Sequence, residues 1–223
     1  MTEDKIKEIL DMLNTLNEYF LSLPDDMLLD IDPRDNESLE RGLIFIKEFN
    51  DSLSQFASGS NRIELQIKKY FSINPEEDDV EKEITQDRKN KRIIKELDDS
   101  IPHTLDENFT YKRPYGFILQ DSAYKGLKTW KNLYSHVLKE LKAYDPQRFS
   151  KLPEEKKFIS KRGNPLFSRK NDELRVGERF GLDFYVEVNL SANHIKNTII
   201  DLLGYFGINY KEMKIYLRED RDA

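Results

Sequence analysis

Apolar side chains in the first seventy residues recur every three or four positions, the spacing that places them along one side of an α-helix. A first helix is predicted from about Glu3 to Leu23, with Thr2 as its N-cap and Pro24 as its stop. Its apolar stripe consists of Ile6, Ile9, Leu10, Leu13, Leu16 and Phe20. A second apolar stripe predicts a second helix, which ends at Ser58-Gly59-Ser60. This stripe consists of Leu39, Leu43, Ile46, Phe49, Leu53 and Phe56. Two antiparallel helices joined by a loop are the economical arrangement.

Residues 61–71 fit either a strand or a helix, and helix is favoured because it extends a helical neighbourhood. From 74 to 108 the composition changes to a dense mixture of charges with few apolar side chains, too few for a core. We interpret this segment as a charged linker that is helical in part between Val80 and Asp98. A long bridging helix is the alternative.

The chain from Phe109 onward alternates between strand and helix patterns. An aromatic, strand-like run to Leu119 precedes a predicted turn and then a helix with Thr129 as N-cap and Trp130 in its buried stripe. The alternation of Phe184, Val186 and Val188 predicts a further strand. Ser191 is the expected N-cap, and Gly207 the expected C-cap, of a last helix. A closing strand follows, with Met213, Ile215 and Leu217 on one side.

These patterns predict an α+β protein: an N-terminal helical hairpin or bundle, then a compact α+β domain with a small sheet and two main helices. The expected organisation is an acidic helical domain over residues 1–73, the charged linker over 74–108 and a basic α+β domain over 109–219. A helical unit of about 70 residues is marginal alone. We therefore expect the first domain to pack on the second or to dimerise.

The amino-acid composition excludes several kinds of catalytic and metal-binding site. The chain has 223 residues, no cysteine and three histidines, so disulfides, thiol nucleophiles and thiolate metal sites are excluded. No apolar run is long enough to span a membrane, and no secretory signal precedes the first helix, so a cytoplasmic protein without membrane contact is expected. The nine glycines form no phosphate-binding loop, and no cofactor is predicted.

The net charge of −6 conceals an uneven distribution. Residues 1–110 carry 27 acidic and 14 basic side chains, whereas residues 111–180 carry 17 basic and 8 acidic ones. Such asymmetry indicates either an anionic partner for the basic part or masking by the acidic part, in the same chain or in a neighbouring copy. The sequence leaves both readings open.

The basic region contains candidate phosphate-binding side chains. Lysines after Thr129 recur every three or four residues on the side of the helix opposite Trp130, and glycine and proline lie beside Lys161 and Arg162. The candidate nucleic-acid-binding residues are Lys112, Arg113, Lys125, Lys128, Lys131, Lys139, Lys142, Lys161, Arg162, Arg169 and Lys170. An exposed, merely solvated helix face is the alternative for the lysines. Trp130 is read as a core residue rather than a base-stacking platform.

Evidence for catalysis is thin. Glu155 and Lys157 match the Glu-x-Lys pair of metal-dependent nucleases, with Asp145 upstream, but such pairs lie on a buried strand, whereas this one follows Pro153 in a charged run. Glu187 lies on a better strand, yet Asn189 stands where that pattern needs lysine. No catalytic residue and no metal site are predicted, and we expect the protein not to be an enzyme.

Four segments carry a resemblance to a known module: Tyr111-Lys-Arg-Pro-Tyr-Gly-Phe117, Thr129-Trp-Lys-Asn-Leu133, Phe167-Ser-Arg-Lys170 and Tyr185-Val-Glu-Val-Asn-Leu-Ser-Ala-Asn193. Over residues 109–217 the chain resembles a C-terminal accessory α+β module of bacterial restriction-modification, phage-defence and mobile-element proteins. The resemblance implies an accessory role in contact with DNA or a partner protein. It brings no catalytic motif.

The leading hypothesis is therefore a non-catalytic accessory protein that binds nucleic acid through a basic patch on its C-terminal domain. The alternative is a protein-interaction or oligomerisation module that binds no nucleic acid, with another protein or a second copy held by the N-terminal helices. A divergent Mg²⁺-dependent nuclease is the third reading. The leading hypothesis requires the cations to converge on one exposed surface without carboxylate partners.

Overall fold

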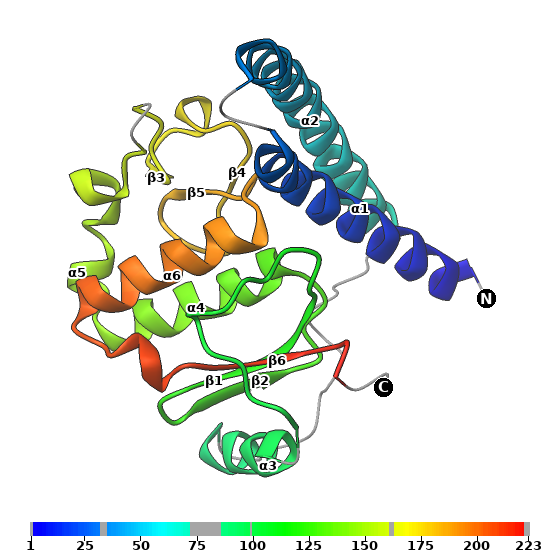
Figure 1. Cartoon of the computed structure of the whole chain (residues 1–223). Coiled ribbons are helices and arrows are strands. Elements are labelled where there is room, and N and C mark those ends of the chain that lie inside the picture. Colours follow the sequence, from blue (N-terminus) through cyan, green and yellow to red (C-terminus); the bar gives the residue numbers. More distant parts are fainter. Residues whose placement is uncertain (1, 32–34, 72–85, 99, 161–162, 221–223) are drawn as a thin grey trace. The chain divides into compact units, whose positions relative to one another are not determined.

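The structure is a computed structural model that describes residues 2–31, 35–71, 86–98, 100–160 and 163–220. The chain divides into two compact units, Met1–Val80 and Glu81–Ala223. The first unit is helical, and the second combines helices with small antiparallel sheets, so the predicted α+β class is confirmed (Figure 1).

The first unit is an antiparallel hairpin of α1 (Thr2–Asp30) and α2 (Asn36–Phe71). Contacts along the hairpin keep one register: Ile6 and Leu10 pack with Ile67, and the ring of Phe20 packs with Phe49 and Phe56. Ile31 lies against Gly42, where a Cβ would stand 2.3 Å from its Cδ1 atom. The predicted pair of antiparallel helices is confirmed.

Two predicted helix ends are wrong. α1 continues through Pro24 to Asp30, and α2 continues through Ser58-Gly59-Ser60 to Phe71. A proline or glycine inside a helix costs about 1 to 3 kcal/mol. Contacts between the two segments nevertheless continue past both positions, since Ile31 lies against Gly42 and Ile67 packs with Ile6 and Leu10. Packing therefore outweighs the local preference. The favoured helical reading of residues 61–71 is confirmed.

The second unit contains two three-stranded antiparallel sheets. In the first, β1 (Pro114–Leu119) lies between β2 (Ser122–Lys125) and β6 (Lys214–Leu217). β1 and β2 are joined by the two-residue turn Gln120-Asp121, in which Gln120 has a φ of 51°. In the second, β5 (Tyr185–Glu187) lies between β3 (Phe167–Ser168) and β4 (Gly177–Glu178).

Helices α4 (Trp130–Tyr144) and α6 (Ala192–Phe206) form the core of the second unit together with the first sheet. Three of the four predicted caps are confirmed: the Thr129 hydroxyl accepts the Asn132 N–H, the Ser191 hydroxyl accepts the His194 N–H, and Gly207 ends α6 with a φ of 75°. The fourth, Thr2, is itself the first helical residue of α1. The short helix α5 (Pro146–Phe149) follows α4, with Asp145 as its N-cap. Single 3₁₀ turns lie at Leu152–Glu154, Lys156–Phe158, Asn171–Glu173 and Tyr210–Glu212.

The other side of the first sheet is covered by α3 (Gln86–Asp98), which falls inside the segment predicted as a linker (Figure 1). Ile93 and Leu97 of α3 are buried with Ile118, Ala123 and Tyr216 of the sheet. The expected helical part of this segment is thus present, and four turns supply enough apolar surface for a small second core. Residues 74–85 and 99 of the predicted linker lie outside the described residues.

Candidate interaction surfaces

Most of the predicted nucleic-acid-binding side chains that the structure describes are paired with carboxylates. Arg113 bonds Glu219 at 3.1 Å, Lys131 bonds Glu178 at 3.1 Å, and Arg169 bonds Glu154 at 2.7 Å. Lys142 lies 3.6 Å from Asp183, Lys170 lies 3.8 Å from Glu173, and Lys125 is hydrogen-bonded to Glu96 of α3.

The remaining candidates have varied surroundings. Lys112 accepts the Trp130 indole N–H at its backbone carbonyl, and its charge contributes to lowering the pKa of Glu107. Lys128 is exposed just before α4, and Lys139 is half-buried within it. Lys161 and Arg162 lie outside the described residues. The carboxylate partners come from α3, the Glu154 turn, the second sheet and the C-terminal segment, so a phosphate would have to displace them at several places.

Trp130 is 1% exposed, and its ring packs against Phe109. The indole N–H is already used by the Lys112 carbonyl at 2.8 Å. The reading of Trp130 as a core residue is confirmed.

The Glu-x-Lys pair and its neighbours have structural partners. Glu155 accepts the Tyr205 hydroxyl, Lys157 lies 3.0 Å from Asp201, and Asp145 accepts the Arg148 N–H as the cap of α5. The pair belongs to a 3₁₀ turn and not to a strand. Among the described residues, no group of His, Asp and Glu side chains could hold a metal ion.

A buried carboxylate lies in the second sheet. Glu187 is 5% exposed and accepts the backbone N–H groups of Arg175 at 2.7 Å, Val176 at 3.3 Å and Asn189 at 2.8 Å. Burial raises its pKa, and the three backbone hydrogen bonds partly offset that rise. Burial also raises the pKa of the Tyr134 hydroxyl, and the Glu187 charge adds to this effect. These bonds tie the segment just before β4 and a residue just after β5 to the Glu187 carboxylate, and they explain why a carboxylate stands on that strand.

His103 joins two distant parts of the second unit. Its Nδ1 lies 2.7 Å from Glu107 and its Nε2 lies 2.8 Å from Asp220. Burial opposes a charge on the ring, but the two carboxylates outweigh it and raise the pKa of His103. The backbones of His103 and Ile215 also form a bridge. His103 therefore ties the segment before β1 to the one after β6.

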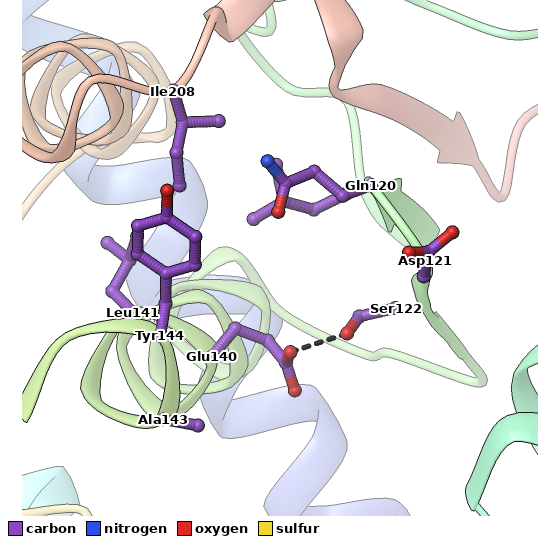
Figure 2. A pocket seen from close by; sticks show the side chains of 9 residues that line it. Gln120, Asp121, Ser122, Glu140, Leu141, Ala143, Tyr144 and Ile208 are labelled. Atoms are coloured by element: carbon purple, nitrogen blue, oxygen red, sulfur yellow. Dashed lines mark hydrogen bonds between the residues drawn. The ribbon is translucent and has the colours of Figure 1, made fainter.

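A small cavity of about 260 Å³ lies where the β1–β2 turn meets the end of α4 (Figure 2). Gln120, Tyr144 and Ile208 line it, and at its edge the Glu140 carboxylate accepts hydroxyls from Ser122 and Tyr124. The cavity is below the usual size of about 300 to 1,000 Å³ for ligand sites. Both oxygens of Glu140 already accept hydrogen bonds from hydroxyl groups. The carboxylate therefore offers a ligand in the cavity few further hydrogen bonds.

In the part of the chain that the structure describes, most of the exposed large apolar side chains lie on the hairpin. Ten of the fourteen strongly exposed large apolar side chains in the described part of the chain belong to α1 and α2. On α1, Ile9 is 48% exposed, Met12 57%, Leu16 42% and Tyr19 38%. Their spacing of three, four and three makes a second stripe beside the one that packs on α2. The prediction that Ile9, Leu16 and Leu43 belong to the packed stripes is therefore wrong, because one neighbouring helix covers only part of α1 or α2.

Residues of α2 extend this stripe across the hairpin. With about 100° between successive residues and α2 antiparallel to α1, Phe45 and Ile63 lie on the same side of the hairpin as Leu16. We call this surface the apolar face; it consists of Ile9, Met12, Leu16 and Tyr19 of α1 and Phe45 and Ile63 of α2. Ser52, Gly59 and Gln66 lie on this side of α2 and carry no charge, and the charged Arg41 and Glu48 lie on the same side. The opposite side of α1 carries Asp11, Asn14 and Glu18.

Comparisons with protein-family models, with curated proteins and with solved structures found no match for this chain. No helix among the described residues is long and apolar enough to cross a membrane. The resemblance to an accessory module of defence and mobile-element proteins stays a prediction.

Proposed function

We propose that the protein is a non-catalytic protein-interaction module that associates with a second copy of itself through the apolar face of the hairpin. The observation that carries this proposal is the second apolar stripe of α1, four large side chains in helical spacing that α2 does not cover. Side chains of this kind cluster on surfaces that bind protein.

The length of the hairpin supports a second copy as the partner. α1 has 29 residues and is therefore about 43 Å long, and two helices side by side are about 20 Å wide. Face-to-face packing of two hairpins over their full length has a footprint of about 860 Å² on each copy, similar to the roughly 800 Å² per partner of a standard stable interface. The product would be a four-helix bundle, in which apolar stripes on two sides of each helix are ordinary.

The geometry favours this function over nucleic-acid binding. Six of the eleven predicted cationic contacts are in ion pairs with carboxylates, whereas the six large apolar side chains of the apolar face are 38% to 57% exposed. Each dimer would then contain two copies of the α+β unit.

Substitution Leu16→Glu tests the proposal in the full chain, with Asn14→Glu on the polar side of α1 as the matched control. Burying an unpaired carboxylate costs several kcal/mol, so Leu16→Glu should weaken association at least about a hundredfold. Light scattering after size exclusion should show a dimer for the wild type and for Asn14→Glu, and a monomer with unchanged helical circular dichroism for Leu16→Glu. Equal masses for all three chains would refute the proposal.

A further inference from the structure

Two arrangements allow the apolar faces of two copies to pack against each other. A two-fold axis parallel to the helices places α1 of one copy on α2 of the other, with every neighbouring pair antiparallel. A two-fold axis across the helices places α1 on α1 and α2 on α2. The two arrangements bury the same surface and differ in which helices meet.

The charges of the two helices distinguish these arrangements. α1 carries eight acidic and two basic side chains, whereas α2 carries five of each. Contact between the two α1 helices would bring strong like charges together, and contact between α1 and α2 avoids this. Electrostatics therefore selects the axis parallel to the helices.

The shape of the apolar face agrees with this choice. A two-fold axis parallel to the helices leaves each residue at its own level, and in the hairpin register Leu16 is level with residues 56 and 57 of α2. The side chain of Leu16 would thus enter the space among Ser52, Phe56 and Gly59 of the second copy. No atom lies within 4 Å of the place where a Cβ of Gly59 would stand, so this space is open. An apolar side chain in a hole formed by small and uncharged residues is the usual packing of helical bundles.

We infer that, given the self-association proposed above, the dimer is a four-helix bundle in which α1 of each copy packs antiparallel on α2 of the other. The two acidic α1 helices then lie diagonally across the bundle. Each is flanked by its own α2 and by the α2 of the second copy.

Cysteine cross-linking tests the arrangement, because the chain has no cysteine of its own. Full-length Tyr19→Cys and Ser52→Cys chains, one with an added tag so that the products differ in mass, are mixed and oxidised. The inferred arrangement brings residue 19 of one copy within about 3 Å, along the axis, of residue 52 of the other. The control mixture pairs Tyr19→Cys with Asn50→Cys, which lies on the side of α2 away from the apolar face.

The inference predicts a mixed 19–52 disulfide at a yield about tenfold or more above the 19–50 control, because dimerisation raises the effective concentration of the two thiols. A sample that sediments as a dimer without this enrichment overturns the arrangement alone. A mixed disulfide between Met12→Cys and Leu16→Cys chains in that sample would show that α1 packs on α1. A sample that stays monomeric overturns the proposed self-association as well.

Discussion

The ring of Phe20 on α1 packs edge-on against the ring of Phe56 on α2, with centroids 5.7 Å apart and an angle of 83° between the planes. Phe49 makes a second edge contact with the same ring at 6.1 Å. Phe20 therefore contacts two positions of α2 and lies on the side of α1 that α2 covers.

Truncation of this ring should destabilise the hairpin. Phe20→Ala removes both aromatic contacts of this half-buried side chain, so the free energy of unfolding should fall by about 1 to 3 kcal/mol. Urea unfolding of the full chain followed by far-ultraviolet circular dichroism measures the change, with Asn14→Ala as the control on the polar side. Equal stability of the two variants would contradict the observed packing.

The packing of α3 on the first sheet makes a separate prediction. Leu97 is fully buried against the sheet, and its Cδ2 atom lies 3.4 Å from the place where a Cβ of Gly116 would stand. Leu97→Ala should destabilise the α+β unit by about 2 to 4 kcal/mol, whereas Lys95→Ala on the exposed side of α3 should change its stability by less than about 0.5 kcal/mol. Near-ultraviolet circular dichroism of Trp130 reports on that unit. If the two substitutions had the same small effect, residues 86–98 would be a linker as first interpreted.

His103 should make stability depend on pH. Its pKa is raised above the ordinary value of 6.5 by Glu107 and Asp220, so the folded state holds the proton more tightly than the unfolded state does. The resulting stabilisation is complete below the unfolded pKa of 6.5 and is lost as the pH rises through the higher folded pKa. The melting temperature of the wild type should therefore fall between pH 6.5 and alkaline pH more than that of His103→Gln. Parallel pH profiles would show that the two carboxylates do not stabilise the protonated ring.

The carboxylate partners of the predicted phosphate-binding residues should suppress nucleic-acid binding. We expect no saturable binding of duplex DNA at about 0.15 M salt, where exposed electrostatic contacts are strongly screened. Replacing Glu154, Glu178 and Glu219 by Gln together should release Arg169, Lys131 and Arg113 and produce salt-sensitive binding. Fluorescence anisotropy at two salt concentrations measures both. Tight wild-type binding with a steep salt dependence would restore the nucleic-acid hypothesis.

Local patterns predicted most elements of the fold. The caps at Thr129, Ser191 and Gly207 are set by side-chain hydrogen bonds or by a positive φ, which depend only on neighbouring residues. The failures at Pro24 and Gly59 have the opposite cause, because packing with a distant helix decides whether a helix continues through such a residue.

The candidate surfaces were harder to predict, because they depend on which residues meet in space. Nothing near Arg113 or Lys131 in the sequence shows that Glu219 and Glu178 will pair with them. The apolar face did have a signal, since Ile9, Met12, Leu16 and Tyr19 keep helical spacing on their own. The sequence pattern placed Ile9 and Leu16 in one stripe with Ile6 and Leu10, so the second stripe of α1 was not recognised.

Sedimentation equilibrium of the full chain over a range of concentrations tests the central claim most directly. The chain mass is 26.5 kDa, so the account predicts a species of twice that mass that dissociates on dilution and that Leu16→Glu abolishes. A mass of 26.5 kDa at every concentration, for wild type and variant alike, would contradict it.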